Sequence, residues 1–187
     1  MSQTFQRFLD LLISTVALVI LLPFIIILIV VGYFDTGSPI FIQRRVGRNK
    51  KEFNIIKFRT MKIGTQSVGT HLVDHNAITK FGNFLRATKV DELPQLVNVI
   101  LGDMSLVGYR PCLPNQKYVI SERDNRDVFD FRPGVTGLAQ INKIDMSTPV
   151  VLAEHDIEMF KSLTLTKYFK YLVLTALGSG RGDRVKK

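Results

Sequence analysis

An uncharged apolar run at residues 11–31, LLISTVALVILLPFIIILIVV, constrains this chain more than any other feature. At about 1.5 Å of rise per helical residue, the run approaches the roughly 20 residues that a membrane helix needs. A secretory signal peptide is the alternative, but the run is longer than a usual signal core, and no small-residue cleavage site follows before GYFDTGSPIF. We therefore predict a membrane-embedded helix in an N-terminal domain at residues 1–34, followed by a second domain at residues 35–187.

Pro23 lies near the middle of this run. Proline removes one helical hydrogen bond and clashes with the preceding turn, so a kink or break is expected there. The helix can still cross the bilayer, or it can turn back as a re-entrant segment with both ends on one side, and the proline alone leaves both geometries open. Basic residues that follow the run place the next domain on the cytoplasmic side under the positive-inside rule. They are Arg44, Arg45, Arg48, Lys50, Lys51 and Lys57.

Beyond residue 35 the patterns predict a mixed α+β domain. Two β-rich stretches flank the turn-like GRNKK and predict a hairpin at residues 40–61, followed by a loop at 62–76. Apolar residues at helical spacing predict a helix within 77–88, and a second helix is expected from Asp91 to Leu101, where Gly102 ends it. Helical patterns return at residues 115–125 and from 151 onward, before the basic tail GSGRGDRVKK.

The charge balance points to anionic partners. The chain has 25 Lys and Arg against 16 Asp and Glu, a net charge of +9. Phosphorylated metabolites, the anionic face of a bilayer and nucleic acid all carry suitable charge. Nucleic acid is disfavoured, because the sequence lacks zinc-finger spacing, an RNA-binding aromatic signature and a helix-turn-helix pattern. With Cys112 as its single cysteine, the chain forms no intrachain disulfide and is compatible with the cytosolic face.

Two adjacent acids, Asp91 and Glu92, precede Pro94 in ATKVDELPQL. If Asp91 is the N-cap of the predicted helix, both carboxylates lie beside unsatisfied backbone donors, and a purely structural cap would look the same. The same position suits phosphoryl chemistry, because an ionised Asp can attack phosphorus and a neighbouring acid can hold Mg²⁺. Arginines beside glycine and proline are suited to bidentate phosphate binding and favour that chemistry. The candidate basic residues are Lys57, Arg59, Arg86, Arg110 and Arg132.

Six stretches in a fixed order resemble one known family. RFLD leads into the proline-broken apolar run, and QRRVG, KFRTM, DELPQLVNVILGDMSLVGYRP, RPGVTGLAQIN and EHDIEMFKSLTL follow. The chain resembles small monotopic phosphoglycosyl transferases of the bacterial sugar transferase family, which begin lipid-linked glycan assembly. The resemblance implies transfer of a phosphosugar from a UDP-sugar to polyprenyl (undecaprenyl) phosphate, with release of UMP. A non-catalytic, basic, membrane-anchored scaffold is the alternative.

The resemblance also implies roles for particular residues. Asp91 would be the nucleophile, and Glu92 would bind Mg²⁺. The five basic residues would contact or support the phosphates, while Asp156 matches a family acid whose role stays open. The helix would be re-entrant at Pro23, with the active site at the cytoplasmic face of the bacterial inner membrane. A homodimer is compatible with the sequence.

Several positions depart from common relatives. Leu22 stands before Pro23 where many relatives have serine, so no hydroxyl at this position can bond the carbonyl that proline leaves free. Tyr109 lies where GPRP is common, and Lys143 follows QIN where many relatives have glycine. The stretch NKIDMSTP therefore points to a subgroup with its own sugar preference.

The helix expected at residues 164–177 has two readings. One is core packing; the other is an interfacial amphipathic helix whose basic and aromatic margin favours anionic lipid. The side expected to lie on the lipid carries Leu165, Phe169, Leu172 and Ala176.

Overall fold

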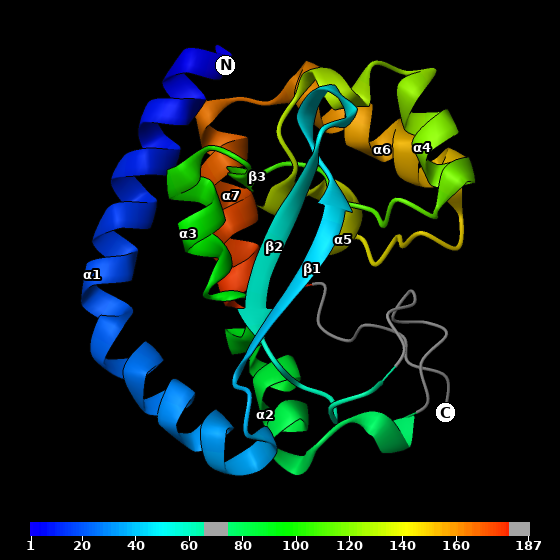
Figure 1. Ribbon diagram of the computed structural model, residues 1–187. Coiled ribbons are helices and arrows are strands. Elements are labelled where there is room, and N and C mark those ends of the chain that lie inside the picture. Colours follow the sequence, from blue (N-terminus) through cyan, green and yellow to red (C-terminus); the bar gives the residue numbers. More distant parts are fainter. Residues whose placement is uncertain (66–74, 180–187) are drawn as a thin grey trace.

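A computed structural model describes residues 1–65 and 75–179. Most of the loop predicted at residues 62–76, and the basic tail from residue 180 onward, lie outside these ranges. The described chain combines helices with small two-stranded sheets, which confirms the mixed helix and sheet class (Figure 1).

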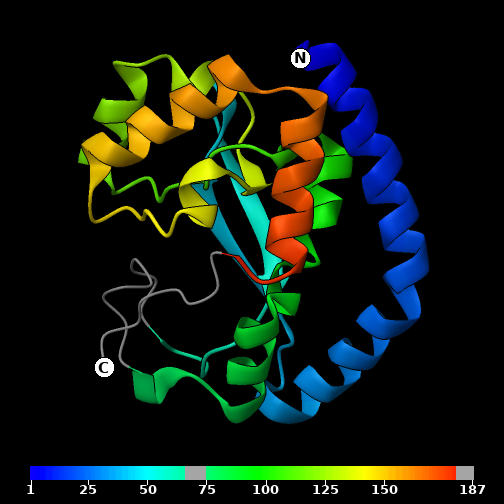
Figure 2. The same cartoon turned by 180° about the vertical axis from the view of Figure 1, so that it is seen from behind.

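α1 (Gln3–Thr36) is one long helix that flanks the rest of the molecule (Figures 1 and 2). The Ser2 hydroxyl accepts from the N–H of Phe5 at 3.2 Å where the helix begins, and Gly37, with a left-handed φ of 73°, ends it. Pro23 lies inside α1, and helical structure continues through it, so the predicted break is not observed. The helix curves instead, because one missing hydrogen bond can bend a helix without ending it. By length and composition, α1 could cross a membrane.

The outer face of α1 is apolar and exposed. Val19, Ile20 and Phe34 have exposed fractions of 68%, 69% and 83%. The inner face buries Ile25 and Leu28 against the body of the protein. An exposed apolar surface of this length marks a contact with lipid or another apolar partner.

The remaining elements form the body that α1 flanks. In chain order they are β1 (Ile40–Val46), η1 (Arg48–Lys50), β2 (Glu52–Phe58), η3 (His75–Ala77), α2 (Lys80–Thr88), η4 (Val90–Glu92), α3 (Gln95–Leu101), β3 (Ser105–Val107), α4 (Lys117–Asp124), η5 (Val128–Asp130), β4 (Gly134–Thr136), α5 (Leu138–Ile141), α6 (Pro149–Ser162) and α7 (Leu165–Ala176). β3 and β4 pair in parallel. A Cβ on Gly134 would lie 2.0 Å from the backbone nitrogen of Gly108, so this close approach of two backbones requires glycine.

The predicted hairpin is confirmed as the antiparallel pair of β1 and β2, with Ile40 opposite Phe58 and Val46 opposite Glu52. Asn98 of α3 ties that helix to β2. Its Oδ1 accepts from the N–H of Ile56 at 2.9 Å, and its Nδ2 donates to the carbonyl oxygen of Asn54 at 2.8 Å. This side chain is 1% exposed, so both bonds satisfy an amide that would otherwise be costly to bury.

Polar side chains in the first turns of α1 attach this helix to the body. Asp10 is 1% exposed. It accepts hydrogen bonds from Ser105 Oγ at 2.7 Å, Leu106 N at 3.1 Å and Tyr168 Oη at 2.8 Å. Arg7 donates to carbonyl oxygens near the C-terminal end of α3. The RFLD stretch therefore docks α1 on α3, β3 and α7.

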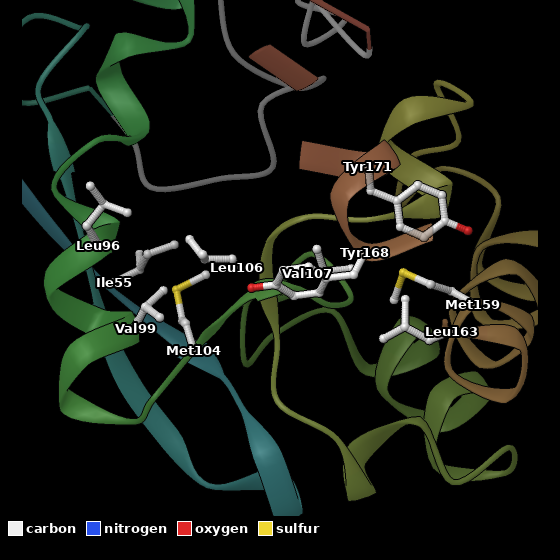
Figure 3. Close-up of a cluster of buried hydrophobic side chains, with 10 residues drawn as sticks. All are labelled: Ile55, Leu96, Val99, Met104, Leu106, Val107, Met159, Leu163, Tyr168 and Tyr171. Atoms are coloured by element: carbon white, nitrogen blue, oxygen red, sulfur yellow. The ribbon is translucent and has the colours of Figure 1, made fainter. Parts of the chain in front are cut away.

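A buried apolar cluster joins β2, α3, β3, α6 and α7 (Figure 3). Its members are Ile55, Leu96, Val99, Met104, Leu106, Val107, Met159, Leu163, Tyr168 and Tyr171. Burial of each large apolar side chain contributes roughly 1.5–3 kcal/mol. The cluster fixes α3, the helix that follows the acid pair, together with α7.

Two local predictions need correction. The helix expected from Asp91 begins at Gln95, with Pro94 in the capping position, because a left-handed turn at Lys89 ends α2 and leaves room only for the short η4. Gly102 ends α3 as predicted, with φ 98°.

The exposed side of α7 also differs from the prediction. Leu165, Phe169 and Ala176 are exposed as expected, and Val173 and Leu177 are exposed in addition. Leu172 instead packs against the buried cluster.

Candidate active site

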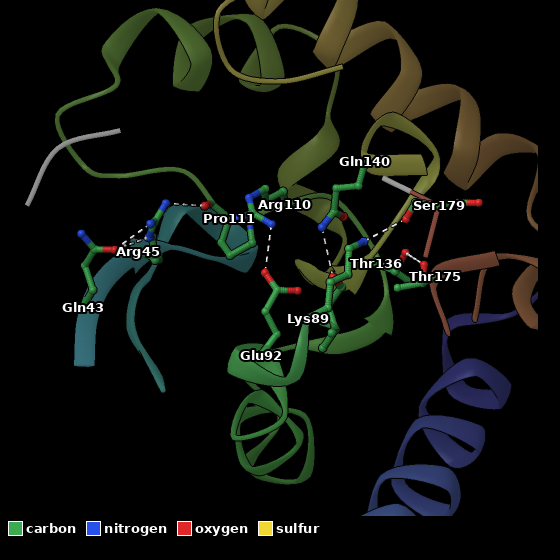
Figure 4. Close-up of polar contacts among 11 residues, drawn as sticks. Gln43, Arg45, Lys89, Glu92, Arg110, Pro111, Thr136, Gln140, Thr175 and Ser179 are labelled. Carbon is green, nitrogen blue, oxygen red and sulfur yellow. Dashed lines mark hydrogen bonds and ion pairs between the residues drawn. The ribbon is translucent and has the colours of Figure 1, made fainter. Parts of the chain in front are cut away.

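Asp91 and Glu92 lie in the short turn between α2 and α3. Lys89, with φ 58°, ends α2, and its N–H donates to the carbonyl oxygen of Arg86 at 3.2 Å. The N–H of Glu92 donates in turn to the carbonyl oxygen of Lys89 at 3.2 Å. The Lys89 ammonium donates to the carbonyl oxygen of Ser179, beyond the end of α7, at 2.9 Å (Figure 4). These bonds hold the acid pair on a turn that packs against β2 and α2.

Three cations from different parts of the chain act on Asp91. They are Lys57 of β2, Arg86 of α2, and Arg110 from the segment after β3. Arg110 Nη1 also lies 3.1 Å from Glu92 Oε1 in an ion pair (Figure 4). Burial and, second, the negative charge of Glu92 raise the pKa of Asp91 from 3.8 to about 7, while the three cations oppose the rise. At neutral pH Asp91 is therefore close to its midpoint, where small changes in local charge alter its ionisation.

Two other arginines predicted as phosphate contacts have different partners. Arg59 Nε donates to the carbonyl oxygen of Ser38 at 2.8 Å, and its guanidinium lies 5.3 Å from the Phe41 ring centroid at the open end of the hairpin. Arg132 Nε donates to the carbonyl oxygen of Gly102 at 2.9 Å. Gly102 follows the C-terminal end of α3, whereas the acid pair precedes its N-terminal end. The structure thus gathers three of the five basic residues around the acid pair and places Arg132 elsewhere.

Comparison with known proteins gives one family over nearly the whole chain. The model of the bacterial sugar transferase family matches residues 1–180. The chain belongs to the bacterial sugar transferase family. The family resemblance seen in the six sequence stretches is therefore confirmed.

Individual members of the family differ in length from this chain. Galactosyl transferase CpsE of Streptococcus agalactiae serotype III is 34% identical over 94% of this chain and 43% of its own length. The exopolysaccharide production protein ExoY of Sinorhizobium fredii is 33% identical over 94% of this chain and 87% of its own length. UDP-glucose:undecaprenyl-phosphate glucose-1-phosphate transferase of Xanthomonas campestris is 32% identical over 90% of this chain and 37% of its own length. The chain therefore spans about two-fifths of two of these relatives and most of the third.

In this member of the family, Asp156 forms a buried ion pair with Arg123. Asp156 Oδ2 lies 2.9 Å from Arg123 Nε and 2.7 Å from Arg123 Nη2. Arg123 Nη1 donates to the carbonyl oxygen of Arg110 at 2.9 Å. Sequence reasoning missed Arg123, because it lies in the charged stretch SERDNRD, where solvated side chains are the ordinary expectation.

The acid pair fits Mg²⁺ through the chemistry of its oxygen atoms. Among residues 1–65 and 75–179, no group of three or more His, Cys, Asp and Glu side chains could hold a metal ion by itself. Mg²⁺, however, commonly binds through one or two carboxylates together with waters and substrate phosphates. Glu92 offers one such carboxylate beside Asp91, so a metal here would need waters and the substrate to complete its coordination.

Proposed function

We propose that this chain transfers a phosphosugar from a UDP-sugar to polyprenyl phosphate, as a first membrane step of glycan biosynthesis. The acid pair of Asp91 and Glu92, with Lys57, Arg86 and Arg110 around it, is the observation that carries the proposal. Membership of the bacterial sugar transferase family supports it. The Xanthomonas relative is named for transfer of glucose 1-phosphate from UDP-glucose to undecaprenyl phosphate, which supports both substrate classes.

The proposed reaction consists of two displacements at one phosphorus atom. First, a carboxylate oxygen of Asp91 attacks the sugar-bearing phosphorus, the P–O bond to the uridylyl phosphate breaks, and UMP departs with the electron pair. An aspartyl phosphosugar remains. Second, an oxygen of polyprenyl phosphate attacks that phosphorus and displaces the Asp91 carboxylate. The product is polyprenyl diphosphate sugar, and neither water nor a redox partner is consumed.

The surrounding charges suit this reaction. Lys57, Arg86 and Arg110 offset negative charge on the diphosphate and on the phosphoryl group in the transition state. Glu92 is the proposed Mg²⁺ ligand, and the bound metal would supply further charge neutralisation. A guanidinium has five N–H donors, so Arg110 can bind a phosphate oxygen while it still orients Glu92.

We also propose that α1 is re-entrant, with the active site on the cytoplasmic face of the bacterial inner membrane. Both ends of α1 contact the same body of the protein, which supports this topology. The Met1 ammonium donates to the carbonyl oxygen of Leu163 at 2.8 Å, and Thr79 Oγ1 donates to Asp35 Oδ2 at 2.7 Å near the other end. A helix that crossed the bilayer would carry its ends to opposite surfaces, where one soluble body could not meet both.

The surface of α7 fits an interfacial placement near the lipid acceptor. Leu165, Phe169, Val173 and Leu177 recur at four-residue spacing and are 45%, 42%, 54% and 75% exposed. Residues four apart lie on one side of a helix, so these side chains form a continuous apolar stripe. With Lys170 exposed beside it, the stripe is suited to the headgroup region of an anionic membrane.

A screen of UDP-sugars tests the proposed reaction. The purified protein would be incubated with polyprenyl phosphate, Mg²⁺ and each sugar nucleotide, and UMP release would be measured. The expected result is release with at least one sugar, and an aspartyl phosphosugar detected by intact-protein mass spectrometry when the lipid acceptor is withheld. Well-folded protein that releases no UMP with any sugar of a broad panel would contradict the proposal and favour a membrane scaffold. Active protein that never forms an adduct would instead indicate direct transfer.

Cysteine labelling tests the topology. Cysteines at Ser2 and Ser179, in a Cys112→Ser background, should both resist an impermeant thiol reagent in intact cells and react after lysis. Pro23→Ala should straighten α1 and increase labelling of position 2 from outside. Outside labelling of position 2 in the parent protein would mean that α1 spans the membrane.

A further inference from the structure

Arg123 is a fully buried cation that the proposed reaction does not use. Its side chain is 0% exposed, and its partner Asp156 is 2% exposed. The guanidinium also lies 4.8 Å from the centroid of the Tyr109 ring. Burial lowers the pKa of Arg123, but the charge of Asp156, with Cys112 and Tyr109, raises it more, so the guanidinium stays charged.

Stability alone is a poor reason for such a pair. Removing two charges from water costs several kcal/mol for each ion, and apolar residues of similar volume often replace a buried pair without loss. The third contact of Arg123 points to a different role, because its Nη1 binds the backbone of Arg110, whose side chain pairs with Glu92. One guanidinium thus connects the buried carboxylate to the residue that contacts the acid pair.

The segment from Tyr109 to Cys112 has no regular secondary structure beyond a single bridge at Tyr109, yet each of its carbonyl oxygens has a separate donor. The donors are Gly134 N to Tyr109 at 2.8 Å, Arg123 Nη1 to Arg110 at 2.9 Å, Arg45 Nη1 to Pro111 at 3.0 Å, and Val46 N to Cys112 at 2.9 Å. In a strand or helix, the regular backbone hydrogen bonds would fix the direction of the Arg110 side chain. In this segment the four separate hydrogen bonds take that role, and Arg123 donates the one that reaches the carbonyl oxygen of Arg110.

We infer that Arg123, with Asp156 as its counter-ion, is a positioning residue that fixes the backbone of Arg110 so that its guanidinium meets Glu92 and the transferring phosphate. The effect on catalysis rests on the proposed phosphosugar transfer, whereas the positioning of Arg110 by Arg123 does not. A planar guanidinium can hold the Asp156 carboxylate on one edge and a carbonyl on another, which a single ammonium group cannot do in the same directions. A displacement of about 1 Å at a phosphate-binding side chain can cost on the order of 100-fold in rate.

Arg123→Lys is the primary test, because it keeps a positive charge beside Asp156. The expected result is a loss of about 10- to 100-fold in kcat with a smaller change in KM for the UDP-sugar. In an Arg110→Ala background the same change should cause no further loss, measured by single-turnover UMP release. In an Arg86→Ala background the full loss should remain, because Arg86 is carried by α2 and Arg110 is still present. Arg126→Lys is the matched control, since Arg126 pairs with Glu122 and Glu154 near the surface.

A second measurement keeps this inference separate from the proposed reaction. The Nε–Hε NMR signal of Arg110, in selectively labelled protein, should shift in Arg123→Lys and stay in place in Arg126→Lys. If the parent protein released no UMP with any sugar, the proposed function would fail, and this signal would still decide the inference. If Arg123→Lys did not fold, the double change Arg123→Met with Asp156→Leu removes both charges together and should give the same NMR shift. An unchanged Arg110 signal, or equal activity losses in both backgrounds, would overturn the inference and make Arg123 a purely structural residue.

Discussion

Two aspartates in this protein, Asp10 and Asp91, are withdrawn from water in opposite ways. Asp10 is 1% exposed and accepts three hydrogen bonds from Ser105, Leu106 and Tyr168, all of them uncharged donors. Asp91 stays partly exposed, lies next to Glu92, and is surrounded by cations. Asp10 is thus fully satisfied by the folded protein itself. The negative charge of Glu92 lies unfavourably close to Asp91, and a bound substrate or metal could offset this repulsion.

The difference separates an acid held by hydrogen bonds from the acid proposed to react. Burial raises the pKa of Asp10 as well, but hydrogen bonds from Ser105, Tyr168 and Leu106 and the charge of Arg7 oppose the rise, and these bonds stabilise the fold. A carboxylate whose pKa is raised to about 7 by burial and by a neighbouring acid is destabilised in the folded state, as is common at functional sites. Replacement of the first should therefore reduce stability, and replacement of the second should reduce activity.

The largest effect is expected from Asp91→Asn. Loss of the nucleophile should abolish the covalent adduct and reduce UMP release by about 10³-fold or more. Because this change also removes a charge that repels Glu92, the midpoint of thermal unfolding should stay the same or rise. Adduct mass, UMP release and unfolding would be measured on the same preparation. A clear loss of thermal stability would show that Asp91 stabilises the turn before α3, and the comparison with Asp10 would fail.

Asp10→Ala tests the other half of the comparison. The change leaves buried donors of Ser105, Leu106 and Tyr168 without their acceptor, which should lower the free energy of unfolding by about 2–4 kcal/mol. Asp10→Asn keeps one acceptor oxygen and should cost clearly less. Unfolding in lipid nanodiscs measures both variants. Residual folded protein of Asp10→Ala should keep its adduct-forming ability, and selective loss of the adduct would assign Asp10 to the chemistry.

Glu92→Gln should have a smaller effect on rate and a distinct effect on pH dependence. Turnover should fall roughly 10- to 100-fold, with weaker dependence on Mg²⁺, because a metal ligand is lost while the nucleophile remains. The pKa of Asp91 should also fall below its value of about 7, because Glu92 is the second cause of its rise. Carboxylate ¹³C NMR of metal-free protein measures this shift. An unchanged Asp91 pKa would mean that burial alone raises it.

The raised pKa of Asp91 also gives a stability profile with a defined sign. Between pH 3.8 and about 7 the unfolded aspartate has lost its proton and the folded one still holds it. The free energy of unfolding of metal-free protein should therefore fall as the pH rises through this window. The slope should be shallower in Glu92→Gln.

Sequence reasoning recovered the features that have local signals. The apolar run gave α1, β-branched stretches gave the hairpin, and Gly102 marked the end of α3. The family resemblance rested on contiguous sequence motifs and was confirmed over residues 1–180. The acid turn was misplaced because Asp91 fits both a helix cap and the short turn that η4 forms, and only the left-handed Lys89 decides between them.

The contacts that sequence reasoning missed all join residues far apart in the chain. Arg123 and Asp156 are 33 positions apart, and Asp10 and Tyr168 are 158 apart. No periodicity connects such pairs, because their meeting depends on how α1, α4, α6 and α7 pack. Arg132 was grouped with the phosphate ligands from its proline and glycine neighbours, and the fold instead directs it to the far end of α3.

The smallest predicted effect concerns a residue with an unfavourable backbone conformation rather than an unfavourable charge. Lys143 has φ 59°, a left-handed conformation that costs an ordinary residue on the order of 1 kcal/mol and costs glycine almost nothing. Glycine at this position would fit this backbone without strain. Lys143→Gly should therefore raise the free energy of unfolding by up to about 1 kcal/mol, less the entropy that glycine adds to the unfolded chain. Lys89→Gly is the matched change at the acid turn, where φ is 58°, but there the Lys89 ammonium also binds Ser179, so the gain should be smaller or reversed. Unfolding midpoints and UMP release of the two variants would be compared. A gain at Lys89 as large as that at Lys143 would mean that the contact between Lys89 and Ser179 adds nothing to the stability of the acid turn.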